Sequence, residues 1–500
     1  MRQLRQHIRF YGLRQSHHPD KFNCLISQQR IEPKLLTSNE SGKAQSSPSL
    51  SNLTYACKDN IVTRNTNSTA ASHALYNYKS PFDATVVELL SREGATCIGK
   101  ANLDEFGMGS ANRNSYYGDV FNPFRPGTVP GGSLGGSAAA VCIPNAKEKS
   151  NSEKEVGVGG EVGEVGKALS DFALGTDTGG SVRLPAAYCD VIGFKPTYGR
   201  ISRWGVIPYA QTLDTVGVLA RKVDIVQRVY DVINRFDEKD PTSLPVEVRS
   251  KIQSVSDGQD ESRKFVIGVP EQFVMRELSD TVREKWSEAL DKFASLGHKV
   301  ISINLRSICK ALPAYYTIAT SEAASNLARY DGTRYGYTAE TPENHEQDLM
   351  RLIFQNRTES LGKEVQRRII LGNYTLSSES AAYYMMANEV REKLAQDFSS
   401  FFTNEHPLLR DASKKKPSEQ LCDLMVCPTA MGVAPTVEEY LSQDKESILN
   451  GYVNDVFTVP ASLVGIPTIS MPFDGVGIQL MGQFGDDALV LQAAKLLEQN

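Results

Sequence analysis

The sequence predicts an α/β protein with a mixed central β-sheet sandwiched between α-helices. Helical and strand-like patterns alternate along most of its 500 residues, and such alternation is typical of layered α/β proteins. The composition is that of a globular protein, with 40% apolar and 23% charged residues. No apolar stretch approaches the ~20 residues that a membrane span needs. We therefore expect a folded chain without a membrane span.

Each expected element has its own local signals. A helix is expected over residues 83–93, with Asp83 as N-cap and Gly94 after its last turn. Ser279 is expected to cap a second helix, which presents apolar residues at helical spacing and closes at Gly297. The other expected elements are strands at 95–99, 172–175, 265–269, 300–305 and 423–427, the last being the final strand, and helices at 222–233 and 488–498.

The chain divides into a leader, a linker and one large domain. Residues 1–30 have the pattern of an organelle transit peptide, because basic residues occur there with no acid before Asp20. A disordered basic tail is the alternative. Residues 31–53 are rich in Ser, Asn and Gly and are predicted to be a linker, so that the folded domain spans 54–500. The arginines that precede Asp20 are Arg2, Arg5, Arg9 and Arg14.

Two parts of this domain depart from the alternating pattern. Residues 145–167 are charged and then repetitive in Gly and Val, with no periodicity that would bury a face. We predict that they form an insertion in a surface loop. Residues 312–401 contain tyrosines in a helical pattern, and we interpret them as a helical specificity region.

Charge and cysteine usage exclude several classes of function. The formal net charge is −5, which predicts no general electrostatic attraction to nucleic acid or to an anionic membrane. Eight scattered cysteines without a CxxC pair argue against a disulfide framework or a zinc knuckle. The seven histidines include no HExxH motif, so no metal site is predicted.

Two glycine-rich segments, 130–137 and 175–183, carry the clearest chemical signal. Neither fits a P-loop or a dinucleotide fingerprint, so nucleotide binding is a weak interpretation. Each contains Gly-Gly-Ser, and the second lies between an expected strand and an expected helix, where consecutive N–H groups form an oxyanion hole. A serine nucleophile needs a base. No histidine has a suggestive context, and Lys58 is the remaining option, since burial can lower the pKa of a lysine enough to make it neutral near pH 7.

These segments resemble the amidase-signature family. The resemblance covers the chain from about residue 55 to its end and is nearest to the A subunits of glutamyl-tRNA(Gln) amidotransferases. It implies the amidase-signature fold. The motifs that carry it are Lys58-Asp-Asn, the segments 130–137 and 175–183, Gly193-Phe-Lys-Pro-Thr-Tyr-Gly, and supporting matches at 99–110, 326–332, 364–372 and 454–460.

The resemblance implies a Ser-cisSer-Lys triad. Ser181 is the implied nucleophile, Ser133 the bridging serine that follows a cis peptide, and Lys58 the neutral base. The alternative for both serines is that Gly-Gly-Ser merely forms tight turns. The implied oxyanion hole consists of the backbone N–H groups of Thr178, Gly179, Gly180 and Ser181.

The resemblance also implies residues that bind the substrate glutamine. Arg367 or Arg368 would grip its α-carboxylate, and Asp455 its α-amino group. The alternative is ordinary charge on a helix surface. Ser110 and Tyr315 or Tyr316 are further candidates, for which a buried structural hydroxyl is the alternative.

The implied function is that of a glutaminase subunit that supplies ammonia for converting Glu-tRNA(Gln) to Gln-tRNA(Gln) in the mitochondrial matrix. The B subunit of such a complex, its kinase and transamidase, would activate the glutamate with ATP and Mg. No cofactor is therefore expected in this chain, and Glu-tRNA(Gln) would be held through the complex. A small accessory subunit is expected too. Leu134 replaces a serine usual in the family, and the usual N-terminal helices are missing. The alternatives are a stand-alone amidase-signature hydrolase of small amides and a catalytically silent assembly scaffold.

Overall fold

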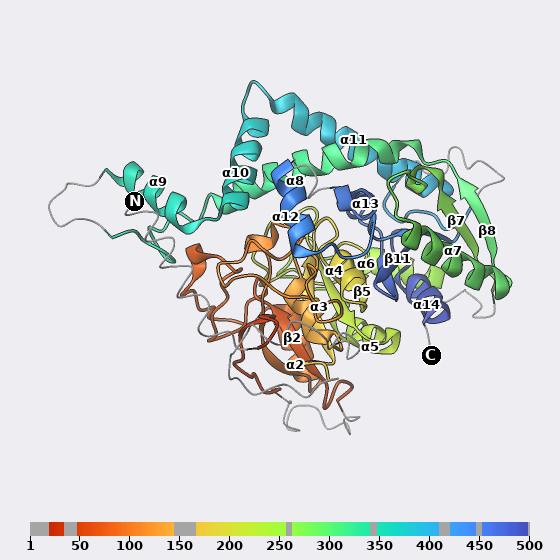
Figure 1. Cartoon of the computed structure of the whole chain (residues 1–500), viewed down its shortest axis with the longest axis horizontal. Helices are drawn as coiled ribbons and strands as arrows, with labels where there is room; N and C mark the ends of the chain where they lie inside the picture. The colour runs from red at the N-terminus through yellow and green to blue at the C-terminus, as the bar shows by residue number, and fades with distance from the viewer. Residues whose placement is uncertain are drawn as a thin grey trace.

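Figure 1 shows the computed structural model of the chain. The structure describes residues 20–34, 48–144, 167–256, 263–340, 348–409, 421–446 and 453–498. The predicted leader up to residue 19 and all but the last residue of the predicted insertion 145–167 lie outside the described residues.

A single mixed sheet of eleven strands organises the described chain, in the order β1-β3-β2-β4-β6-β5-β10-β11-β9-β7-β8. Parallel pairs join β2 to β3 and β4, and β7 to β8 and β9, whereas the strands between are antiparallel. The predicted fold class is therefore confirmed. The strands are β1 (Leu25–Ser27), β2 (Thr54–Lys58), β3 (Thr96–Ala101), β4 (Phe172–Asp177), β5 (Ile192–Lys195), β6 (Thr215–Ala220), β7 (Val266–Pro270), β8 (Lys299–Ile303), β9 (Leu424–Pro428), β10 (Thr468–Phe473) and β11 (Val476–Gly482).

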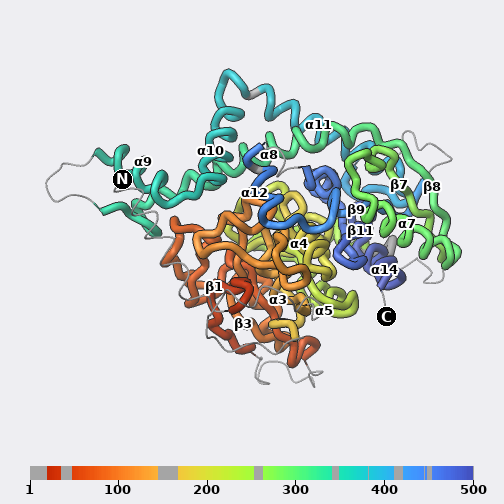
Figure 2. Tube along the Cα trace, in the orientation of Figure 1, coloured from red at the N-terminus to blue at the C-terminus, as the bar shows by residue number. Residues whose placement is uncertain are grey.

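Helices surround this sheet. In Figures 1 and 2 the N-terminal strands, in red to orange, lie toward the bottom, and β7 and the edge strand β8, in green, lie at the right. The α-helices of the described chain are α2 (Thr85–Arg92), α3 (Gly135–Val141), α4 (Arg183–Tyr188), α5 (Val223–Ile233), α6 (Val246–Ser256), α7 (Asp280–Ser295), α8 (Ala311–Leu327), α9 (Leu349–Ser360), α10 (Lys363–Leu376), α11 (Ala381–Phe401), α12 (Val437–Glu446), α13 (Val459–Val464) and α14 (Asp487–Leu497). None of the described helices is long and apolar enough to cross a membrane.

Helix starts show where local signals succeed. The side chain of Ser279 accepts a hydrogen bond from the N–H of Val282 and caps α7, as predicted. The predicted cap of α2 is wrong, because the N-cap is Ala84 and has no side-chain hydrogen bond. Asp83 instead accepts a hydrogen bond from the N–H of Arg64, at 2.7 Å.

Several strands escaped prediction. The strand at 424–428 is not the final one, because β10 and β11 follow it as an antiparallel hairpin in the middle of the sheet. Both are buried over nearly their whole length, as are β5 and β6. Strands buried on both faces lack the alternation of apolar and polar residues by which a strand is recognised.

The folded domain begins earlier than the predicted boundary at residue 54. Strand β1 pairs with β3, and Ile31 forms a bridge with Cys97. The carboxylate of Asp20 accepts hydrogen bonds from the N–H groups of Cys24 and Leu25. Residues 20–31 therefore belong to the domain, which corrects the C-terminal part of the predicted leader 1–30 and the start of the predicted linker 31–53.

Four helices, α8 to α11, occupy the region predicted as helical, 312–401. They lie along the upper side of the molecule in Figure 1. Helices α10 and α11 both pack against α8, which brings the N-terminal half of α10 close to the glycine-rich segments of the sheet.

Candidate active site

Lys58 is the last residue of β2, between β3 and β4, and its side chain has no solvent exposure. Its Nζ lies 3.0 Å from Ser133 Oγ, 2.9 Å from Thr176 Oγ1 and 3.3 Å from the carbonyl oxygen of Thr176. Asn60 donates a second hydrogen bond to the same Thr176 hydroxyl, at 3.0 Å. Lys58 is therefore anchored in the sheet and not on the surface.

Burial lowers the pKa of Lys58 to about 7, although the carboxylates of Asp214, Asp104 and Asp177 act in the opposite direction. Its amine is thus half neutral near pH 7, and a neutral amine has a lone pair with which to take a proton. The structure gives this lysine the properties of a base.

The two serines lie at the starts of two helices. Ser133 follows a cis peptide bond after Gly132 and is fully buried just before α3. Ser181 follows β4, precedes α4 and keeps 9% of its surface exposed, in a small pocket. Gly107 lies over the Ser133–Lys58 pair, since a Cβ there would come within 3.6 Å of Ser133 Oγ.

A buried ion pair fixes the turn that carries Ser181. Arg183 and Asp177 form two hydrogen bonds, of 2.9 and 2.8 Å, and both side chains are completely buried. Arg183 also donates to Ser462 Oγ and to the carbonyl oxygen of Thr458. The Arg183 guanidinium group therefore bonds both to Asp177 at the end of β4 and to residues of α13 and its N-cap, and it connects the Ser181 turn to that helix.

Within this turn the glycines are needed for space. A Cβ on Gly179 would lie 2.4 Å from the hydroxyl of Tyr315, and one on Gly180 would lie 2.3 Å from Thr458 Oγ1. Gly179 and Gly180 line the pocket beside Ser181. Thr178, the other predicted oxyanion-hole residue, is not among the residues that line it, and its hydroxyl donates to Asp214 at 2.7 Å.

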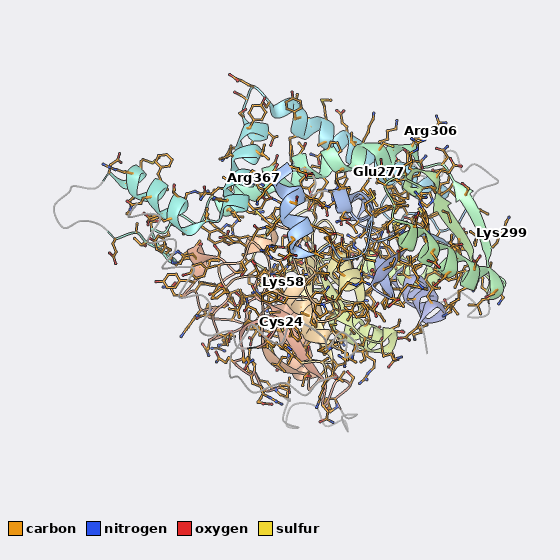
Figure 3. All side chains as sticks on the ribbon, viewed as in Figure 1. Cys24, Lys58, Glu277, Lys299, Arg306 and Arg367 are labelled. Carbon is orange, nitrogen blue, oxygen red and sulfur yellow. The ribbon has the colours of Figure 1, made fainter. Side chains whose placement is uncertain are left out.

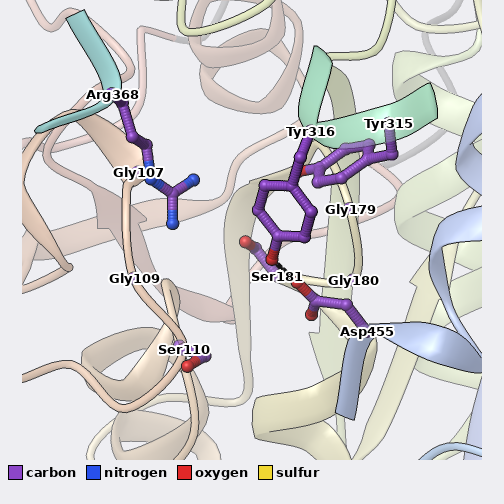
Figure 4. A pocket seen from close by; sticks show the side chains of 11 residues that line it. Gly107, Gly109, Ser110, Gly179, Gly180, Ser181, Tyr315, Tyr316, Arg368 and Asp455 are labelled. Atoms are coloured by element: carbon purple, nitrogen blue, oxygen red, sulfur yellow. Dashed lines mark hydrogen bonds between the residues drawn. The ribbon is translucent and has the colours of Figure 1, made fainter. Parts of the chain in front are cut away.

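The pocket beside Ser181 is small and partly open to solvent. Figure 4 shows Arg368 entering it from one side and Asp455 from the other, with Ser181 between them. The residues that line it are Gly107, Gly109, Ser110, Gly132, Gly179, Gly180, Ser181, Tyr315, Tyr316, Arg368 and Asp455.

The structure separates the two arginines that the sequence left open. Arg368 is 5% exposed, faces the pocket, and donates to Glu364 at 2.8 Å and to the hydroxyl of Tyr209 at 2.6 Å. Arg367, labelled on α10 in Figure 3, is not among the residues that line the pocket, and its side chain is 37% exposed and paired with Glu364. Arg368 is therefore the arginine in position to meet a ligand.

Asp455 and the two tyrosines form the opposite wall. The hydroxyl of Tyr316 donates to Asp455 Oδ2, and Tyr315 packs edge-on against Tyr316. Burial raises the pKa of Asp455 to about 6, while the Tyr316 hydrogen bond and the Arg368 charge act to lower it. The carboxylate is still mainly ionised at pH 7. Both candidate tyrosines line the pocket, and Ser110 lies at its rim, 3.5 Å from the hydroxyl of Tyr440.

Comparison with known proteins agrees with this geometry. The family model described as Amidase matches residues 14–146 and 157–491. This chain belongs to the amidase family. Among its relatives is the A subunit of the mitochondrial glutamyl-tRNA(Gln) amidotransferase of Candida albicans, which is 54% identical over 95% of each chain. The relative of the same name from Yarrowia lipolytica is 41% identical over 95% of this chain and 97% of its own.

Solved structures of other amidases share the fold. The A subunit of the glutamyl-tRNA(Gln) amidotransferase of Thermotoga maritima matches with a TM-score of 0.68 and 31% identity, over 96% of this chain and 88% of its own. A 6-aminohexanoate cyclic dimer hydrolase matches with a TM-score of 0.67 at 22% identity, over 89% of this chain and 84% of its own, which supports the fold alone. The relatives from Candida albicans and Yarrowia lipolytica are named mitochondrial, and this confirms the mitochondrial location that was expected from the leader together with the implied activity.

Sequence reasoning gave no role to several residues of this amidase site. Thr176, which contacts Lys58, and Gly107 and Gly109, which line the pocket, are the main ones. The two glycines stand in the 99–110 segment, one of the family matches, so that segment was the available signal. In the described part of the chain, no group of three or more His, Cys, Asp and Glu side chains is arranged to hold a metal ion.

Proposed function

We propose that this chain is the glutaminase subunit of a glutamyl-tRNA(Gln) amidotransferase and hydrolyses glutamine through Lys58, Ser133 and Ser181. One observation carries the proposal. A buried lysine with a pKa of about 7 contacts a serine beside a pocket that holds a second serine, and an arginine and a carboxylate face that pocket. The related A subunits of Candida albicans and Yarrowia lipolytica support it.

The contacts of Lys58 fit a proton acceptor. A neutral amine has two N–H groups and one lone pair, and the Nζ has three neighbours. The carbonyl of Thr176 is only an acceptor, and the Thr176 hydroxyl accepts a hydrogen bond from Asn60 as well. With both N–H groups directed at Thr176, the lone pair points to the hydroxyl of Ser133, 3.0 Å away.

The reaction then runs through a proton relay. Ser181 Oγ attacks the side-chain amide carbon of glutamine while its proton passes to Ser133 and the proton of Ser133 passes to Lys58. The relay then runs in reverse: Lys58 returns a proton to Ser133, and Ser133 gives one proton to the amide nitrogen, which leaves as ammonia. Water then attacks the glutamyl ester in a second round of the relay and releases glutamate. No cofactor is required for either step.

Charge on the carbonyl oxygen develops in each tetrahedral intermediate. The backbone N–H groups of Gly179, Gly180 and Ser181, with that of Thr178, are proposed to stabilise it. Since Gly179 and Gly180 are held against Tyr315 and Thr458, this stretch is fixed before the substrate arrives.

The two charged walls select an amino acid and not a small neutral amide. Arg368 is proposed to bind the α-carboxylate of glutamine and Asp455 its α-ammonium group. A buried arginine and a half-buried carboxylate facing one pocket suit a zwitterion, because each then meets an opposite charge of the ligand in addition to its partner in the protein, Glu364 for Arg368 and Tyr316 for Asp455. This favours a glutaminase over a hydrolase of simple amides.

The ammonia is proposed to pass to the B subunit, the kinase and transamidase of the complex, which uses ATP and Mg to activate the glutamate of Glu-tRNA(Gln). A small accessory subunit would complete the assembly. Since this chain has a net charge of −5, we propose that the tRNA is held through the complex and not mainly by this chain. The proposed compartment is the mitochondrial matrix.

Ammonia release from glutamine tests the proposal. The chain assembled with its partner subunits should release ammonia, release should rise when Glu-tRNA(Gln) is added, and Ser181→Ala should abolish it. Ser137→Ala is the matched control, because Ser137 is a buried serine on α3 whose hydroxyl donates to the carbonyl of Leu174 and not to the proposed relay. If the complete assembly released no ammonia, the catalytically silent scaffold would be favoured. If it released ammonia from simple amides but not from glutamine, the hydrolase of small amides would be favoured.

A further inference from the structure

The 99–110 segment contains two consecutive buried acids whose side chains connect different parts of the site. It begins in the last residues of β3 and turns at Phe106, whose φ is 51°, whose ring stacks on Tyr330 at 5.0 Å and whose N–H donates to the carbonyl of Ala70. Gly107, one residue later, lies over Ser133 and Lys58. The segment is therefore part of the wall around the proposed base.

Asp104 connects this turn to the serine side of the pocket. Its N–H donates to the carbonyl of Ser133 at 3.2 Å. Its carboxylate accepts hydrogen bonds from the N–H groups of Asn112, Arg113 and Asn114, at 2.9 to 3.0 Å. These contacts fix the loop that carries Ser110.

Glu105 connects the same turn to the arginine side. Its Oε1 accepts a hydrogen bond from the hydroxyl of Ser72 at 2.5 Å, and its Oε2 accepts one from the N–H of Gly362 at 2.7 Å. Gly362 is the N-cap of α10, so Glu105 satisfies one of the N–H groups that a helix leaves unpaired at its start. A Cβ on Gly362 would lie 2.2 Å from Glu105 Oε2, which means that the helix end sits directly on the carboxylate.

Helix α10 carries Arg368, less than two turns beyond Gly362. Arg368 also contacts Tyr209, which belongs to a different part of the chain, so the guanidinium group can stay in place only if the helix holds its position along its axis. Burial raises the pKa of Glu105 to about 7, so its carboxyl group holds the start of α10 through the hydrogen bond from Gly362, and its negative charge adds to this only in the ionised fraction.

We propose that Glu105 is a positioning residue for substrate selection: it fixes α10 so that Arg368 reaches the α-carboxylate of glutamine. This inference rests on the proposed function and adds to it, because it separates the residues that carry out the chemistry from a residue that sets which amide is accepted. An error of about 1 Å in placing a substrate group costs about a hundredfold in rate.

The test compares two amides in the chain assembled with its partner subunits. Butanamide has the carbon chain of glutamine from the side-chain amide to the α-carbon but lacks both α-charges. For Glu105→Ala we expect the ratio of kcat/KM for glutamine to that for butanamide to fall about tenfold or more, mainly through a higher KM for glutamine. Glu105→Gln keeps an oxygen acceptor for the Gly362 N–H and should restore most of the ratio.

Ser72→Ala serves as the matched control, since it removes the other hydrogen bond of the same carboxylate and leaves the contact with α10. We expect it to leave the ratio within about twofold of the wild type. An equal loss on both amides in Glu105→Ala, or no rescue by Glu105→Gln, would overturn the inference. If Glu105→Ala does not fold, Glu105→Asp, whose carboxylate is one methylene too short for Gly362, replaces it with the same expected fall. Failure of the proposed function is recognised separately, as a wild-type assembly that does not prefer glutamine.

Discussion

Replacement of Arg368 by methionine tests the separation of the two arginines on α10. Arg368 is buried and faces the pocket, whereas Arg367 is its exposed neighbour and shares the same partner, Glu364. Methionine keeps most of the length of the side chain and removes the charge. Arg367→Met is therefore a matched control for an effect of lost charge on this helix.

The size of the effect follows from the contact that is lost. A hydrogen bond to a charged group contributes about 1.5–3 kcal/mol, and each ~1.4 kcal/mol is a factor of ten. We expect kcat/KM for glutamine to fall about 10- to 150-fold in Arg368→Met, and less than about threefold in Arg367→Met. Glu364 keeps one arginine partner in either variant, so neither change leaves its charge unpaired.

Steady-state ammonia release from glutamine and from butanamide provides the assay. The loss in Arg368→Met should appear on glutamine and not on butanamide, because butanamide has no carboxylate for the guanidinium group to bind. Equal losses in the two arginine variants, or an equal loss on both amides, would refute the assignment of Arg368 to the α-carboxylate.

Three further predictions concern the base and the turn beneath the nucleophile. Glutamine hydrolysis should rise with pH through about 7 and fall about tenfold per pH unit below it, since only neutral Lys58 accepts a proton; a profile that is flat from about pH 5 to 8 would contradict this role. Thr176→Val should lower kcat about 5- to 150-fold, because a Lys58 N–H loses its acceptor at a cost of about 1–3 kcal/mol; kcat equal to that of the wild type would show that Thr176 does not orient the amine. Arg183→Met should reduce the free energy of unfolding by about 3–5 kcal/mol in a denaturant titration, because Asp177 is left charged and buried, and adding Asp177→Asn should recover part of it.

The sequence was informative where a residue acts through its immediate neighbours. Ser279 caps α7 from its own side chain, and the strand and helix next to Ser181 follow from a local pattern. Asp83 has the same capping chemistry as Ser279, but a partner 19 positions away in the chain, Arg64, takes its carboxylate. A contact with a residue this far away in the chain cannot be predicted from the residues around the helix start.

The choice between Arg367 and Arg368 shows a signal that was present but obscured. Val365, Arg368, Ile369 and Gly372 are the buried residues of α10 and have the spacing of one helical face, which puts Arg368 on the inner side. The exposed Ile370 and Leu371 interrupt this pattern, so the buried face is recognisable only once the helix is packed against α8.

The ion pair beneath Ser181 has a consequence for how the active site is assembled. Arg183 finds its hydrogen-bond partner Thr458 at a distance of 275 positions along the chain, and the hairpin of β10 and β11 inserts into the middle of the sheet and not at its edge. Contacts so distant in sequence form late in folding, because a long loop must close first. A nascent chain therefore lacks a complete pocket beside Ser181, and we expect the proposed ammonia release only when the last third of the protein has folded onto the sheet.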